Sequence, residues 1–210
     1  MKNVNYFLGL VLMTIFIIPI YSCQSQIKFN SAEQVADSLA LKMNGPNERV
    51  KSEWAKTINV LNQRNAKSEE LIKVIDKSTN GASAETKELA AILNKFKSIN
   101  QSDELLINEE LFNVFTKQLE DYKTSLQKVF ILAEKNKINN SSFHEITVKI
   151  EDLEKKIAFQ RQKYNEEAHS YNSKIKNNTN DKFYEKYPNL RKKCYFKVNE
   201  GVNKAPKIQF

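Results

Sequence analysis

Glycine and proline are scarce in this chain, which has only four of each in 210 residues. Sheet proteins need such turn residues at intervals of about eight to twelve positions. The scarcity therefore favours long, uninterrupted helices and argues against a sandwich or a barrel. The sequence predicts an all-α fold.

Cysteine and histidine are scarcer still, with two of each. Cys23 and Cys194 form no CxxC pair, so no redox or zinc site is indicated. A di-iron bundle needs Glu-x-x-His pairs on two helices, and Glu166-Glu-Ala-His169 is the only such pair here. We expect His144 and His169 at the surface, and neither a metal nor any other cofactor.

Catalytic motifs are also missing from the sequence. There is no Ser-His-Asp order, no Gly-rich phosphate loop and no HExxH motif. The carboxylates lie on charged helix faces, where pairing with lysine four residues away accounts for them. We therefore predict a non-enzymatic protein, with an unrecognised hydrolase as the least favoured hypothesis.

The charge balance is basic, with 33 Lys and Arg against 25 Asp and Glu and a formal net charge of +8. The lysines alternate with acidic residues and form no block. This pattern favours an ordinary solvated surface over contact with anionic lipid or polymer, and we expect no nucleic-acid partner.

The N-terminus has the pattern of an export signal. Lys2 precedes an apolar run from Tyr6 to about Ile18, shorter than the roughly 20 residues that span a bilayer. Ile20-Tyr21-Ser22-Cys23 follows and resembles the lipobox of bacterial lipoproteins, although Tyr21 is larger than the usual residue. We predict a lipoprotein signal peptide over residues 1–22 and lipidation of Cys23, whose acyl chains would give firm anchoring.

Two alternatives to this lipoprotein remain open: an uncleaved N-terminal helix anchor, and a cleaved, soluble form. All three place the body outside the cytoplasm, in the periplasm or at the surface of a bacterial cell envelope. In the lipoprotein and in the uncleaved helix anchor, membrane lipid is a partner through the N-terminus.

Behind the signal we expect an anchor linker over residues 23–46. Ser31-Ala-Glu-Gln34 has the form of a capping box, which predicts a short helix to about Met43. Asn44-Gly45-Pro46 is expected to interrupt it. The next helix carries Val50, Trp54, Ile58 and Leu61, and its polar middle, residues 62–70, is either exposed or an interior polar layer.

Three further helices follow. Asn80-Gly81 marks a turn before an apolar stripe at Leu89, Ile92, Phe96 and Ile99. The next stripe keeps a period of 3.5, typical of coiled-coil-like packing, at Phe112, Phe115, Leu119, Tyr122, Leu126, Val129 and Ala133. A last helix is expected from the box Ser142–Glu145 to about Lys176, with a stripe at Phe143, Ile146, Ile150, Leu153, Ile157, Tyr164, Ala168, Tyr171 and Ile175.

Long apolar stripes need helices alongside to shield them from water. We therefore predict an elongated antiparallel four-helix bundle over residues 47–178. Residues 179–210 form an aromatic, basic and irregular tail, which we expect to pack back on the bundle.

The last helix and the tail carry a family resemblance. Arg161-Gln-Lys-Tyr164-Asn165 and Tyr171-Asn172-Ser-Lys-Ile175 resemble the R-x-x-YN-x-x-V-x-x-YN-x-x-I signature of the LemA family, and Tyr195-Phe196 through Phe210 resembles its YF…EG…KAPKVDF ending. Trp54, Leu61 and Arg64 are similar to its early W-x₆-L-x-x-R helix. Lys67-Ser68-Glu69 and residues 134–140 depart from the family pattern, which has Leu-Ile-Pro and E-x-YP-x-L-K there.

The resemblance implies a membrane-anchored helical bundle with no established enzymatic activity. The motif residues are then either structural or a docking surface: Trp54, Arg64, Arg161, Tyr164, Asn165, Tyr171 and Asn172. In the structural interpretation the tyrosine hydroxyls reach polar partners, the asparagines bind tail or loop backbone, and Arg161 pairs with a carboxylate. We favour an envelope scaffold or interaction protein with an unknown protein partner; the alternative is a ligand or signal sensor with a pocket near Arg64 and Arg161.

Overall fold

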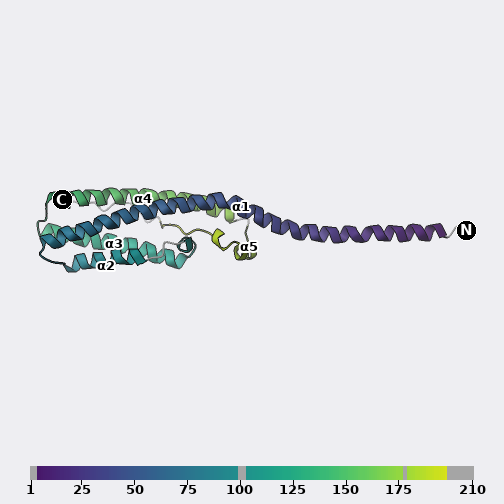
Figure 1. Cartoon of the computed structure of the whole chain (residues 1–210), viewed down its shortest axis with the longest axis horizontal. Helices are drawn as coiled ribbons and strands as arrows, with labels where there is room; N and C mark the ends of the chain where they lie inside the picture. The colour runs from purple at the N-terminus through teal and green to yellow at the C-terminus, as the bar shows by residue number, and fades with distance from the viewer. Residues whose placement is uncertain (1–3, 99–102, 177–178, 198–210) are drawn as a thin grey trace. The chain divides into compact units, whose positions relative to one another are not determined.

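The computed structural model describes the backbone of residues 4–98, 103–176 and 179–197, and the side chains from residue 33 onward within those ranges. The elements are α1 (Val4–Ser78), α2 (Ala84–Ser98), the 3-10 helix η1 (Asp103–Leu106), α3 (Glu109–Lys135), α4 (Ser141–Ile175), α5 (Asp181–Lys186) and the 3-10 helix η2 (Pro188–Leu190) (Figure 1). The described residues contain no strand. The all-α prediction is therefore confirmed for this part of the chain.

The chain divides into two units, Met1–Asn44 and Gly45–Phe210. Two predicted helix boundaries near the division are wrong, because α1 begins at Val4 instead of Ser31 and stays helical through Asn44-Gly45-Pro46. A proline acts within about one turn, where it removes one backbone donor. Helix propagation resumes wherever the flanking residues are good helix formers, so a local breaker is a weak predictor of a helix end.

The predicted signal peptide over residues 1–22 and the lipidation of Cys23 concern side chains that lie outside the described set. Among the residues that the structure describes, none of the helices has both the length and the apolarity that a membrane crossing requires.

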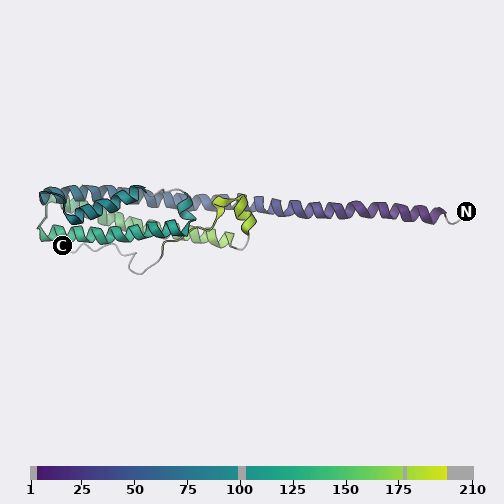
Figure 2. The same cartoon turned by 90° about the horizontal axis from the view of Figure 1, so that it is seen from below.

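Within the second unit, the later part of α1 lies beside α2, α3 and α4 (Figures 1 and 2). Trp54 of α1 packs against Tyr164 of α4, with ring centroids 5.5 Å apart. About three turns further along α1, Arg64 binds Glu154, which lies about three turns earlier in α4. Helices α1 and α4 therefore run in opposite directions here.

The buried faces of the helices follow the predicted stripes. Every described residue of the stripes in α2, α3 and α4 is buried, and Ile99 lies outside the described residues. In α1, Arg64, Asn65 and Ser68 are buried as well. Of the two alternatives for residues 62–70, the interior polar layer is thus the one observed.

The turns use local backbone chemistry. The turn predicted at Asn80-Gly81 follows α1, and these two residues have positive φ values of 57° and 147°. The predicted cap of α4 at Ser142 is wrong: Asn140 is the N-cap, and its side chain accepts from the backbone N–H of Phe143. Asparagine satisfies an orphan N–H as well as serine does, so the cap falls two residues earlier.

The described part of the tail is mostly ordered by contacts with the helices. Asn180 caps α5, and Phe183, Leu190 and Phe196 are buried. The backbone N–H of Cys194 donates to the carbonyl of Leu106 in η1, at 2.8 Å. Lys193 and Phe196 also bond to side chains of α4, so residues 193–197 lie alongside that helix.

Candidate functional site

An aromatic cluster joins α1, α3, α4 and the tail; its members are Trp54, Phe112, Phe115, Tyr164 and Phe196. Ring centroids lie 5.3 Å apart for Trp54 and Phe115 and 5.1 Å apart for Phe112 and Phe196. Most pairs are tilted or edge-to-face, which is the favoured arrangement of aromatic rings. A tail residue, Phe196, thus completes the core between the helices.

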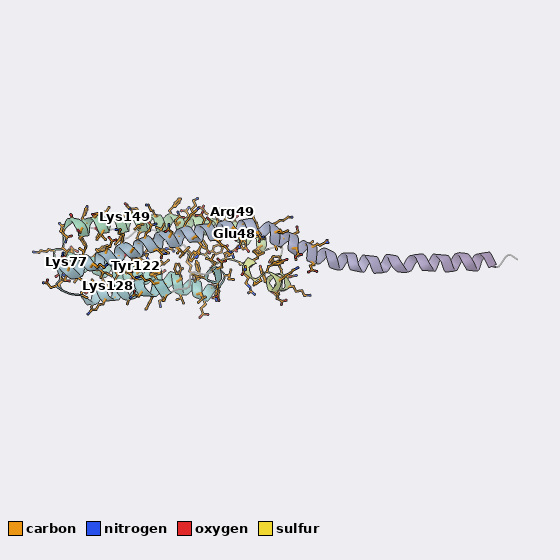
Figure 3. The ribbon with its side chains drawn as sticks, viewed as in Figure 1. Glu48, Arg49, Lys77, Tyr122, Lys128 and Lys149 are labelled. Atoms are coloured by element: carbon orange, nitrogen blue, oxygen red, sulfur yellow. The ribbon has the colours of Figure 1, made fainter. Side chains whose placement is uncertain are left out.

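A polar layer lies further along the same helices; its members are Arg64, Asn65, Ser68, Tyr122 and Glu154. Arg64 is 1% exposed, and its Nη1 donates to Glu154 Oε1 at 3.0 Å. Its Nε and Nη2 donate to Asn65 Oδ1 at 3.2 and 2.8 Å. The guanidinium carbon lies 3.6 Å from the ring centroid of Tyr122 (labelled in Figure 3).

Ser68 connects this layer to Tyr122. Its hydroxyl donates to the carbonyl of Arg64 at 2.9 Å and lies 2.7 Å from the Tyr122 hydroxyl. Because the serine proton is committed to Arg64, Tyr122 must be the donor to Ser68. Burial raises the pKa of Tyr122 to about 12, which keeps this donor protonated at neutral pH.

The described residues of the polar layer pack closely together. The hollow lined by both Arg64 and Arg161 measures only about 10 Å³, which is room for at most one water. The charge of Arg64 is neutralised by Glu154 within the core. The layer therefore connects α1, α3 and α4 through side-chain contacts.

The two YN pairs of α4 bind the tail backbone. Asn165 Nδ2 donates to the carbonyl of Phe196, and the N–H of Phe196 donates to Asn165 Oδ1, both at 2.9 Å. Asn172 makes the same two bonds to Lys193, both at 2.8 Å. Each asparagine thus satisfies one donor and one acceptor of the tail, in the role that we expected.

The spacing of the two pairs explains why they occur together. Seven residues of α-helix advance about 10.5 Å, and the three residues from Lys193 to Phe196 span about 10 Å when extended. Two asparagines one heptad apart are therefore in register with two tail residues three apart. Between these two tail residues lies Cys194, whose carbonyl accepts from the Tyr164 hydroxyl at 2.9 Å.

Tyr171 differs from Tyr164. Its hydroxyl is buried and has no hydrogen-bond partner among the described residues, so the expected polar partner is not observed there. The ammonium of Lys193 lies 5.2 Å from its ring centroid. Burial raises the pKa of both tyrosines well above the usual value.

Arg161 does not make its expected ion pair with any described residue. It is 6% exposed, its guanidinium carbon lies 4.5 Å from the ring centroid of Phe196, and its Nε has no described hydrogen-bond partner. The nearby carboxylate of Glu154 is bound to Arg64. Burial lowers the pKa of Arg161, while Glu154 and Glu120 oppose this shift.

Sequence reasoning missed two residues of this region. Glu154 follows the core phase of α4, with Ile150, Ile157 and Arg161 at spacings of four, three and four, and this phase was the signal that could have revealed it. Lys193 is 4% exposed and donates to the carbonyl of Asn189, and burial lowers its pKa to about 8. Nothing in the local sequence distinguishes it from its exposed neighbours Arg191 and Lys192.

The remaining candidates lie at the surface or outside the core. His144 and His169 are exposed, as predicted. Cys194 is half-buried, and burial raises the pKa of its thiol to about 11. No group of three or more potential metal ligands occurs among the described residues.

Comparison with known proteins gives a family match. The family model described as LemA family matches residues 53–210. No curated protein and no solved structure matches the chain.

Proposed function

Because the chain belongs to the LemA family, we propose that it is a non-enzymatic, membrane-anchored protein of the bacterial cell envelope. Its body would be an antiparallel four-helix bundle that serves as a scaffold for another envelope protein. The sequence before Cys23 supports the anchor. The filled interior of the bundle supports the scaffold.

The observation that carries the proposal is the use of the polar motif residues. Arg64 neutralises Glu154, and Asn165 and Asn172 are occupied by tail backbone. Residues held in an ion pair or in backbone hydrogen bonds stabilise the packing of the helices and the tail. They are not available as acids, bases or nucleophiles. A rigid helical surface is then what the protein offers to its surroundings.

The surface is suited to a polar contact. A few large apolar side chains are exposed on α3 and α4, for example Val114, Ile131 and Phe159. Between them lie ion pairs such as Lys128–Glu88 and Lys163–Glu166. Such a surface favours a transient, salt-sensitive interface over an obligate apolar one.

The alternative function, a sensor with a pocket between Arg64 and Arg161, has less support. It requires an interior cavity lined by both arginines. The hollow that they share is about 10 Å³, which excludes a small organic ligand.

The anchor is tested by Cys23→Ala, with Cys194→Ala as the matched control, since these are the two cysteines of the chain. We expect Cys23→Ala to lose the mass of the lipid and to shift from the membrane fraction, and Cys194→Ala to keep both. Globomycin treatment of the unaltered protein should retain the signal peptide. Unchanged mass and membrane association in Cys23→Ala would assign the anchor to an uncleaved helix.

The scaffold role is tested in cells by crosslinking and affinity purification from detergent-solubilised envelopes. We expect one recurrent envelope protein, recovered less at high salt. Recovery of no partner, together with a deletion strain whose envelope properties are unchanged, would contradict the role.

A further inference from the structure

A groove runs along the outer side of α4 beside the tail. It encloses about 550 Å³ and is lined by Arg161, Gln162, Glu166 and His169 of α4 and by Phe196 and Lys197 of the tail. It is distinct from the small interior hollow shared by Arg64 and Arg161. None of the functions discussed above uses it.

Arg161 is the unusual residue of this groove. It is more than nine-tenths buried, yet it has no ion pair among the described residues, and its Nε has no described hydrogen-bond partner. A buried guanidinium without a counterion costs several kcal/mol. The tail, which the Asn165–Phe196 bonds hold in place, covers one face of the guanidinium with the Phe196 ring.

We propose that this groove is a binding site for a carboxylate group, held by Arg161 and by Lys197 at the rim. A guanidinium stacked on a ring still presents its edge, and two N–H groups on one edge match the two oxygens of a carboxylate. Lys197 is exposed and adds a second positive charge.

The surrounding charges favour a carboxylate over a phosphate. Glu166 lines the groove, although its carboxylate is bound by Lys163 at 2.8 Å and by Gln162 at 3.0 Å. The negative charges of Glu154 and Glu120 also favour the charged form of Arg161 and oppose the lowering of its pKa by burial. A group with two negative charges would be repelled by these acids more than a group with one.

The carboxylate has two possible sources. One is a separate molecule, such as the C-terminus of a peptide. The other is this chain, in which Glu200 follows Lys197 in the sequence. Glu200 is three residues beyond Lys197, and an extended chain of that length reaches about 10 Å.

The test uses the full-length protein in carboxylate-free buffer and follows the Arg161 Nε–H signal by NMR. The probe is acetyl-alanyl-alanine with a free carboxylate, and its C-terminal amide is the control ligand. We expect the acid to shift the signal and the amide to leave it unchanged. The affinity should fall as salt is added, because the contact is partly exposed.

Variants locate the site, and calorimetry measures their affinity. Arg161→Gln should weaken the binding of the acid at least about tenfold, the loss typical of a charge-assisted hydrogen bond. Lys197→Gln, at an exposed position where the change should not disturb folding, should weaken the binding of the acid less, by roughly twofold to fivefold. Lys155→Gln, an exposed lysine of α4 outside the groove, should leave the affinity unchanged.

A further variant, Glu200→Gln, separates the two sources because it removes the glutamate that follows Lys197. If the acid binds this variant but not the unaltered chain, the chain's own carboxylate is the natural occupant. If it binds both equally, a separate molecule is. Binding of the amide as tightly as the acid, or no binding of the acid to either chain, would overturn the proposal.

Discussion

The aromatic cluster and the polar layer lie on the same helices, about three turns apart, and hold them together by different physics. The aromatic cluster buries rings whose contacts are non-directional and tolerant of small shifts. The polar layer fixes donors to acceptors at set distances around one buried ion pair. The aromatic cluster supplies most of the apolar burial in its own part of the helices. The polar layer sets the alignment of α1 against α4 and of α1 against α3.

The largest expected effect is in the polar layer. Glu154→Gln keeps the shape of the side chain and leaves the Arg64 charge buried without a counterion. We expect the free energy of unfolding to fall by about 3 kcal/mol or more, measured by urea denaturation. Glu151→Gln, which removes a surface pairing with Lys155, is the control and should cost less than about 0.5 kcal/mol.

A double variant sharpens this result. Arg64→Met combined with Glu154→Leu replaces the ion pair by apolar groups and should recover most of the loss. A Glu154→Gln protein as stable as the Glu151→Gln control would show that the buried charge is compensated elsewhere.

The next effect concerns the attachment of the tail to the aromatic cluster. Asn165→Ala leaves the N–H and the carbonyl of Phe196 without their side-chain partner. We expect a loss of about 2 kcal/mol and faster hydrogen exchange at the Phe196 amide. Gln162→Ala, which removes an exposed bond on the same helix, should cost only a few tenths of a kcal/mol. Equal exchange of the Phe196 amide in both variants would show that the Asn165 bonds do not hold the tail in place.

Within the aromatic cluster a conservative change should be milder. Phe112→Leu removes part of a ring and keeps an apolar side chain, so we expect a cost of about 1 to 1.5 kcal/mol by urea denaturation. If Phe112→Leu proved more damaging than Glu154→Gln, the contrast between the two regions would be reversed.

A further effect tests whether a buried charge in the tail behaves like Arg64. The pKa of Lys193 is lowered by burial to about 8, whereas an unfolded lysine titrates near 10.5. Between these values the unfolded state binds more protons, so the free energy of unfolding should rise as the pH increases from about 8 to 10.5.

Lys193→Met should abolish this rise. Comparing the two proteins over a pH series cancels titrations common to both. Parallel curves for the two proteins would contradict the burial of a charged Lys193.

The heptad stripes made much of this architecture predictable. The residues that the period placed on the apolar faces of α3 and α4 are all buried, because helical periodicity is a local property. Helix ends were predicted less well. Pro46 does not end α1, because the cooperativity of the helix outweighs a single breaker, and Asn140 is the cap of α4 in place of Ser142. The asparagine contacts with the tail were anticipated, but their exact partners, Lys193 and Phe196, were not.

The sequence by itself determined that the described chain is helical, which faces of α2, α3 and α4 are apolar, and that it belongs to the LemA family. Only the tertiary structure decided which charges meet: Glu154 binds Arg64 and leaves Arg161 against Phe196. The physical reason is that periodicity acts over a few residues, whereas ion pairing depends on side chains 90 positions apart in the sequence. Such a pairing exists only after the helices have been brought side by side.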